Sequence, residues 1–102
     1  MIHVIATIEL AEGRRDDFLK EFHALVPQVR AEEGCIEYGP AVDADSGIPV
    51  QGPLRENVVV VLEKWESLEA LKAHLVAPHM KTYRAAVKDL VQNTALEILQ
   101  PA

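Results

Sequence analysis

The segment from Glu63 to Tyr83 holds most of the side chains that could do chemistry. It contains the only tryptophan of the chain, Trp65, and two of its four histidines, His74 and His79. A neutral imidazole can accept a proton near neutral pH, because its unperturbed pKa is about 6.5. A histidine beside an aromatic ring is therefore either a base at the edge of a pocket or a packed side chain that hydrogen-bonds to the backbone.

The two histidines differ in their local patterns. His74 lies between Leu71 and Leu75 on the apolar side of a predicted helix, so we expect it to point toward the core. Burial there would lower its pKa and keep it ready to accept a proton, which makes it the first candidate general base. His79 follows Pro78 at the start of a further helix, where the dipole disfavours a positive charge. It is the second candidate base, and the alternative for each histidine is a structural hydrogen bond.

The sequence predicts no metal and no organic cofactor. His74 and His79 are five residues apart across a proline, so they do not share a helical face, and no third ligand is evident. Glu32 and Glu33 are interpreted as a solvated helix end. No phosphate-binding glycine loop or haem-ligand pattern occurs.

Four other side chains could line a pocket for a flat ligand. Trp65 either packs between strand and helix or forms a pocket wall. Tyr38 and Tyr83 could each donate a hydrogen bond to a ligand oxygen, or pack in the core. Glu63 shares a strand face with Trp65, and its carboxylate could orient a histidine or pair with a basic residue across the sheet.

Composition limits the class of protein. A chain of 102 residues with 49 % apolar residues predicts one folded domain, 1–102. The net charge of −6 argues against nucleic acid or an anionic membrane as a partner. No apolar run approaches the ~20 residues of a membrane helix, and the single cysteine fits a reducing compartment, so we expect a cytoplasmic protein.

The order of the predicted elements indicates a ferredoxin-like fold. We expect strands at 2–10, 35–42, 57–65 and 95–99, a helix from Arg14, and helices from Ser67 and Pro78. The first helix carries the apolar stripe Phe18, Phe22, Leu25 and Val29. Pro27 should bend this helix and Gly34 should end it. The loop 44–57 could include a short extended piece at 48–51. The resulting order, βαββαβ with a broken second helix, is the ferredoxin-like α+β sandwich.

The strand at 57–65 has apolar residues on both faces. The helices of the chain can cover only one face, so a second subunit is the natural cover for the other. We therefore expect a homodimer whose sheets pack face to face.

Eight segments carry a resemblance to a known family. They are Val4-Ile-Ala-Thr-Ile8, Leu25-Val-Pro27, Glu33-Gly-Cys35, Tyr38, Glu63-Lys-Trp-Glu-Ser67, Ala73-His-Leu75, Pro78-His-Met-Lys-Thr-Tyr83 and Ile98-Leu-Gln-Pro101. In this order and spacing they resemble the antibiotic-biosynthesis monooxygenase (ABM) family, and within it the bacterial quinol monooxygenase branch. The haem-degrading branch is not expected, because the positions near Thr7, His74 and Arg84 do not match its pattern.

The resemblance implies a dimeric α+β barrel that oxidises quinols or related phenols with O2, without metal or flavin. With such a substrate, His74 or His79 is the candidate base, and Trp65, Tyr38, Tyr83 and Glu63 are the candidate residues around a small aromatic ring. The alternative is a different use of the same pocket, as a small-molecule isomerase or a ligand-binding domain.

Overall fold

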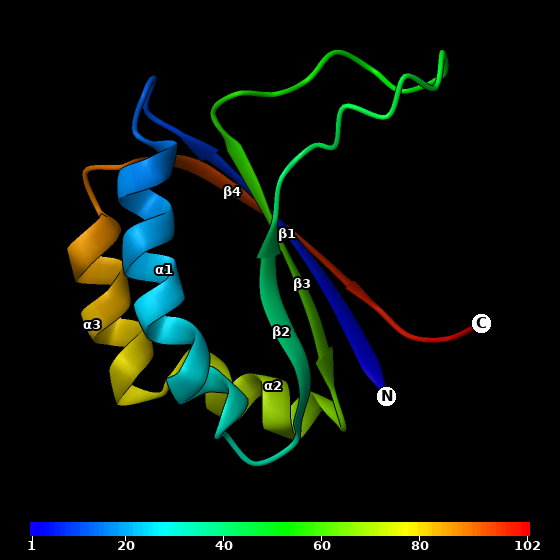
Figure 1. The fold of residues 1–102 in the computed structure, drawn as a ribbon. Helices are drawn as coiled ribbons and strands as arrows, with labels where there is room; N and C mark the ends of the chain where they lie inside the picture. Colours follow the sequence, from blue (N-terminus) through cyan, green and yellow to red (C-terminus); the bar gives the residue numbers. More distant parts are fainter.

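Four strands and three helices make up the computed structural model, which describes residues 1–102. In chain order they are β1 (Ile2–Leu10), α1 (Arg15–Arg30), β2 (Cys35–Ala41), β3 (Val58–Trp65), α2 (Leu68–Leu75), α3 (Pro78–Val87) and β4 (Val91–Leu99). All neighbouring strands are antiparallel, in the order β2-β3-β1-β4, and the helices lie on one side of the sheet (Figure 1). This arrangement is the predicted ferredoxin-like α+β fold.

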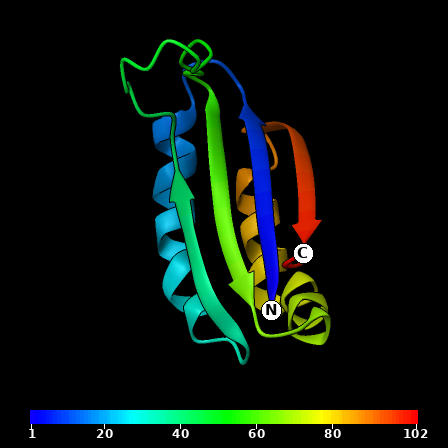
Figure 2. The same cartoon turned by 90° about the vertical axis from the view of Figure 1, so that its right-hand side faces the viewer.

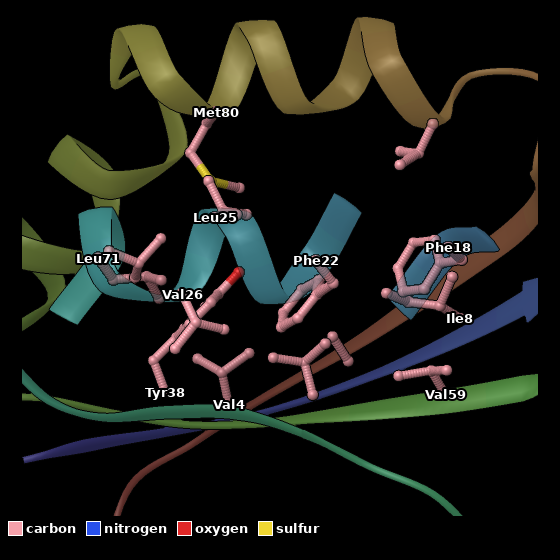
Figure 3. Packing of buried hydrophobic residues seen from close by; sticks show 14 of the residues in the cluster. Val4, Ile8, Phe18, Phe22, Leu25, Val26, Tyr38, Val59, Leu71 and Met80 are labelled. Carbon is pink, nitrogen blue, oxygen red and sulfur yellow. The ribbon is translucent and has the colours of Figure 1, made fainter. Parts of the chain in front are cut away.

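Alternation along the strands determines which side chains face the helices. On β1 the even-numbered residues from Ile2 to Leu10 are buried, and on β3 the odd-numbered residues from Val59 to Trp65 are buried. The predicted stripe of α1 packs against them from the other side. The core therefore lies between the sheet and the helices, as Figure 3 shows from close by and Figure 2 shows with the helices behind the sheet.

The end of α1 differs from the prediction in one respect. The helix passes Pro27 without a break and ends at Arg30, but Gly34 lies four residues beyond that end. Gly34 has a φ of +84°, and a Cβ at this position would lie 2.6 Å from the Cβ of Ala70. Glycine is therefore required here because φ is positive and because the turn closely approaches α2, and not because it ends the helix.

The last strand and the long loop also differ from the prediction. β4 begins at Val91 and not at Ala95, because pairing with β1 forms a strand from residues whose own pattern is too polar to predict one. The loop has no extended piece at 48–51, where the chain turns. The boundaries at Arg14, Val42 and Asn57 each move by one residue, which is ordinary variation at element ends.

A broken helix carries the two histidines of interest. The Ser67 side chain accepts a hydrogen bond from the backbone N–H of Ala70 and thereby caps α2. Pro78 occupies the first turn of α3, where its missing N–H costs nothing. His74 therefore lies in the last turn of α2, and His79 in the first turn of α3. None of the three helices has both the length and the apolar character that crossing a bilayer requires.

Candidate active site

A cavity of about 430 Å³ lies between the sheet and the helices. This volume falls within the range of roughly 300–1,000 Å³ found for small-molecule sites. Its lining is mainly apolar and includes Ala6, Ile8, Phe22, Tyr38, Val61, Glu63, His74, Leu75, Met80, Tyr83, Arg84, Val87, Lys88, Val91, Thr94 and Leu96. Four of the six predicted site residues, Tyr38, Glu63, His74 and Tyr83, therefore surround one space, while Trp65 and His79 do not line it.

Glu32 joins the two histidines. Its Oε2 atom lies 2.8 Å from Nδ1 of His74 and 2.8 Å from Nε2 of His79. The three side chains come from the turn after α1, the end of α2 and the start of α3. The prediction of a solvated helix end at Glu32 is wrong, because this side chain is only 13 % exposed and both histidines contact it.

These contacts determine which ring nitrogen of His74 carries the proton. An ionised carboxylate only accepts hydrogen bonds, so Nδ1 of His74 donates to Glu32 and Nε2 keeps its lone pair. Nε2 makes no hydrogen bond within the protein, and no side-chain nitrogen or oxygen is both buried and unpartnered. Since His74 lines the cavity, we infer that Nε2 opens onto it.

Burial lowers the pKa of His74, and the hydrogen bond and charge of Glu32 oppose this effect. The imidazole is 2 % exposed, and its ring centroid lies 4.6 Å from that of Trp65. The His74 imidazole is therefore neutral near pH 7, and it is held in one orientation by the Glu32 carboxylate and the Trp65 indole ring.

Glu63 adds a second acid–base group to the cavity wall. Its Oε1 atom accepts a hydrogen bond from Nε1 of Trp65 at 2.9 Å, so the carboxylate neither orients a histidine nor pairs with a basic residue, the two alternatives that the sequence offered. Burial raises the pKa of Glu63 to about 7, although the bond from Trp65 opposes the rise. Near neutral pH this side chain can therefore either donate or accept a proton.

The aromatic residues occupy distinct places. Trp65 is completely buried against His74. Tyr38 projects from β2 toward the helices (Figure 3), with its ring centroid 5.4 Å from that of His74. Burial raises the pKa of both Tyr38 and Tyr83, so their hydroxyl groups stay protonated and can donate hydrogen bonds into the cavity.

The Glu32 cluster is also the one place with a plausible set of metal ligands. The ligand atoms of Glu32, His74 and His79 all lie within 4.8 Å of one another, so the expectation that no third ligand exists is wrong. Two imidazoles and a carboxylate form a donor set that suits zinc. The same three groups also satisfy one another through hydrogen bonds.

Glu32, Arg84 and Lys88 are not among the site residues predicted from the sequence. For Glu32 a signal was available, because the residue lies just beyond the C-terminus of α1, where the helix dipole disfavours a negative charge. A carboxylate at such a place is stabilised by a hydrogen-bond donor, and the two histidines contact Glu32 there.

Comparisons with known proteins agree with this architecture. The family model described as "Antibiotic biosynthesis monooxygenase" matches residues 1–86. The chain is 43 % identical over 103 residues to the probable quinol monooxygenase YgiN of Escherichia coli, covering 99 % of this chain and 98 % of that protein.

Two solved structures have the same fold. They are PA3566 from Pseudomonas aeruginosa (TM-score 0.81, 27 % identity, 99 % of this chain and 93 % of that one) and Rv0793 from Mycobacterium tuberculosis (TM-score 0.80, 28 % identity, 99 % and 94 %). The predicted family is thereby confirmed, and the chain belongs to the antibiotic biosynthesis monooxygenase family.

Proposed function

We propose that this protein is a cofactor-independent monooxygenase that oxidises a quinol or a related phenolic aromatic with O2. The observation that carries the proposal is the neutral His74, whose Nε2 opens onto an apolar cavity while Glu32 holds Nδ1. The similarity to a protein named as a probable quinol monooxygenase supports the choice of substrate class.

The base removes the main obstacle to the reaction. Triplet O2 reacts slowly with closed-shell molecules, but a deprotonated quinol can donate an electron to it directly. In this scheme Nε2 of His74 takes the proton from a substrate hydroxyl, and the quinolate reduces O2. One oxygen atom then joins the ring, and the other leaves as water. The products are a hydroxyquinone and water, which balance one quinol and one O2.

The other groups of the cavity have supporting roles in this proposal. The hydroxyl groups of Tyr38 and Tyr83 donate hydrogen bonds to the substrate oxygens as negative charge develops. Glu63 supplies the proton that accompanies loss of water. The apolar side chains exclude bulk water and present a surface for a flat ring.

An oxygen electrode tests the proposal. The purified protein, incubated with a reduced naphthoquinone, should raise O2 uptake above autoxidation by roughly 10²-fold or more, the low end of general-base catalysis. A metal chelator should leave the rate unchanged. No stimulation with any quinol tried, or a rate abolished by chelation and restored by one metal, would overturn it.

A second function has one observation in its favour. His74 and Glu63 are two acid–base groups on one cavity, which is the arrangement that a proton-shift isomerase needs. Turnover of a ligand without O2 consumption would favour this alternative over the oxygenase.

We also propose that the protein is a homodimer. On the sheet face opposite the helices, Ile5 and Val60 are only partly exposed and Leu62, at 45 % exposure, extends the apolar surface. A face of this kind is usually covered in solution. Light scattering at micromolar concentration should give twice the monomer mass, and Leu62→Lys should shift the protein toward monomer. A wild-type monomer would overturn the proposal.

A further inference from the structure

Two basic residues occupy the rim of the cavity. Arg84 and Lys88 lie one turn apart at the end of α3, so they share a face of the helix. Both line the cavity and both are exposed, so they lie where it meets solvent. Neither is within ion-pair distance of a carboxylate, although the chain has 16 acidic residues and only 10 lysines and arginines.

Arg84 is fixed in place, whereas Lys88 is free to adapt. Nη2 of Arg84 donates to the backbone oxygen of Leu75 at 2.7 Å, which holds the guanidinium near the end of α2. The remaining N–H groups of this guanidinium are available to a ligand, since it carries five in all. Lys88 makes no hydrogen bond within the protein, so its ammonium can move to meet a charge.

No carboxylate of the cavity neutralises the positive charges of Arg84 and Lys88. Glu63 is the only acidic side chain that lines the cavity, and it accepts a hydrogen bond from Trp65 in the interior. Glu32 is hydrogen-bonded to His74 and His79. An uncharged quinol would therefore leave the two cations of the rim without a partner.

We propose that Arg84 and Lys88 bind an anionic substituent of the substrate, so that the preferred substrate is an aromatic hydroxy acid, with a carboxylate at the rim and a hydroxyl group toward His74. A guanidinium binds a carboxylate through two parallel hydrogen bonds, and a nearby ammonium adds a second charge. The aromatic ring would then lie against Phe22, Val61 and Met80. The oxidation of such a substrate rests on the proposed function, but its binding does not.

The test compares two ligands that differ in one carboxylate. The affinities of 6-hydroxy-2-naphthoic acid, whose hydroxyl and carboxylate lie at opposite ends of the ring system, and of 2-naphthol are measured by titration calorimetry on the whole protein. The acid should bind about 10-fold more tightly at low salt, the value of one hydrogen bond between charged groups. Lys88→Gln and Arg84→Gln should each remove most of this preference while changing naphthol affinity less than about 2-fold. Lys72→Gln, on α2 and outside the cavity lining, is the matched control and should change neither affinity.

The two ligands and the variants separate the possible outcomes. Equal affinity for the acid and the naphthol, or a preference that survives both Lys88→Gln and Arg84→Gln, overturns the anion site. O2 uptake with a neutral quinol alone would then leave the oxygenase proposal standing. A preference lost in both variants supports the anion site even where no O2 is consumed, and in that case the oxygenase proposal is the one that fails.

Discussion

The interior and the rim of the cavity hold their polar groups in opposite ways. In the interior, His74 is 2 % exposed, and its Nδ1 lies 2.8 Å from a carboxylate that comes from another part of the chain. At the rim, Lys88 is exposed and has no partner. The interior thus holds Nε2 of His74 at a fixed position, whereas the Lys88 ammonium at the rim can adjust its position.

This difference suggests a division of work between the two regions. Proton transfer requires a base within hydrogen-bond reach of the reacting group, so a fixed interior suits the chemical step. Selection by charge tolerates some movement, so a flexible rim suits recognition. Interior variants should then change kcat, while rim variants should change ligand affinity.

The largest expected effect is that of His74→Ala. Removing the base should lower turnover by roughly 10²-fold or more, because that is the usual contribution of general-base catalysis. Unfolding should remain cooperative, since Nε2 of the ring faces a cavity. Turnover and melting temperature are measured on the same preparation, with His23→Ala on the exposed side of α1 as the control. Near-normal turnover with a lowered melting temperature would show that His74 is structural.

The sequence predicted the position of His74 because the signal is local. Leu71 and Leu75 identify the apolar side of a short helix, and the structure places all three on the side facing the core or its edge. The fold was predictable for the same reason, since the stripe of α1 and the alternation along β3 each show within a few residues.

The rest of the site depends on contacts that are distant in sequence. Glu32 lies 42 residues before His74, and only the packing of the α1 turn against α2 and α3 brings them together. The strand character of 91–94 likewise depends on pairing with β1. Glu63 shared a strand face with Trp65 as predicted, but its bond to the indole depends on how both side chains are buried.

The next prediction concerns the pH dependence of stability that Glu63 causes. It tests whether the interior of the cavity is as desolvated as the burial of Glu63 indicates. The folded protein raises the pKa of Glu63 from 4.5 to about 7, so its protonated form stabilises the fold. This contribution to the free energy of unfolding is complete below pH 4.5 and is lost as the pH rises through 7. The difference between the two limits corresponds to about 3 kcal/mol. Relative to Glu63→Gln, which cannot titrate, the wild-type free energy of unfolding should therefore fall across this range.

Urea unfolding of both proteins at several pH values between 4 and 8 measures the difference. Glu37→Gln is a suitable control, because Glu37 lies on β2 with an exposed side chain paired to Lys64. If the wild-type and Glu63→Gln curves stay parallel, the carboxyl group of Glu63 has the same pKa in the folded and the unfolded protein, and the interior is wetter than its burial indicates.

The smallest of these effects is expected for Glu32→Gln, which should lower kcat by about 10-fold. This is the size of effect found when a hydrogen-bond partner that orients a histidine is weakened. Glutamine keeps the shape and an acceptor oxygen but loses the charge that raises the pKa of His74 against burial. The pKa of His74 should therefore fall further, and the acid limb of the kcat/KM profile should move to lower pH. A purely structural Glu32 would lower the melting temperature and leave this limb in place. The matched variant Glu33→Gln removes the neighbouring charge, and Glu33 contacts neither histidine. If the acid limb moves by a similar amount in both variants, the cause is a general charge effect, and a specific role for Glu32 is contradicted.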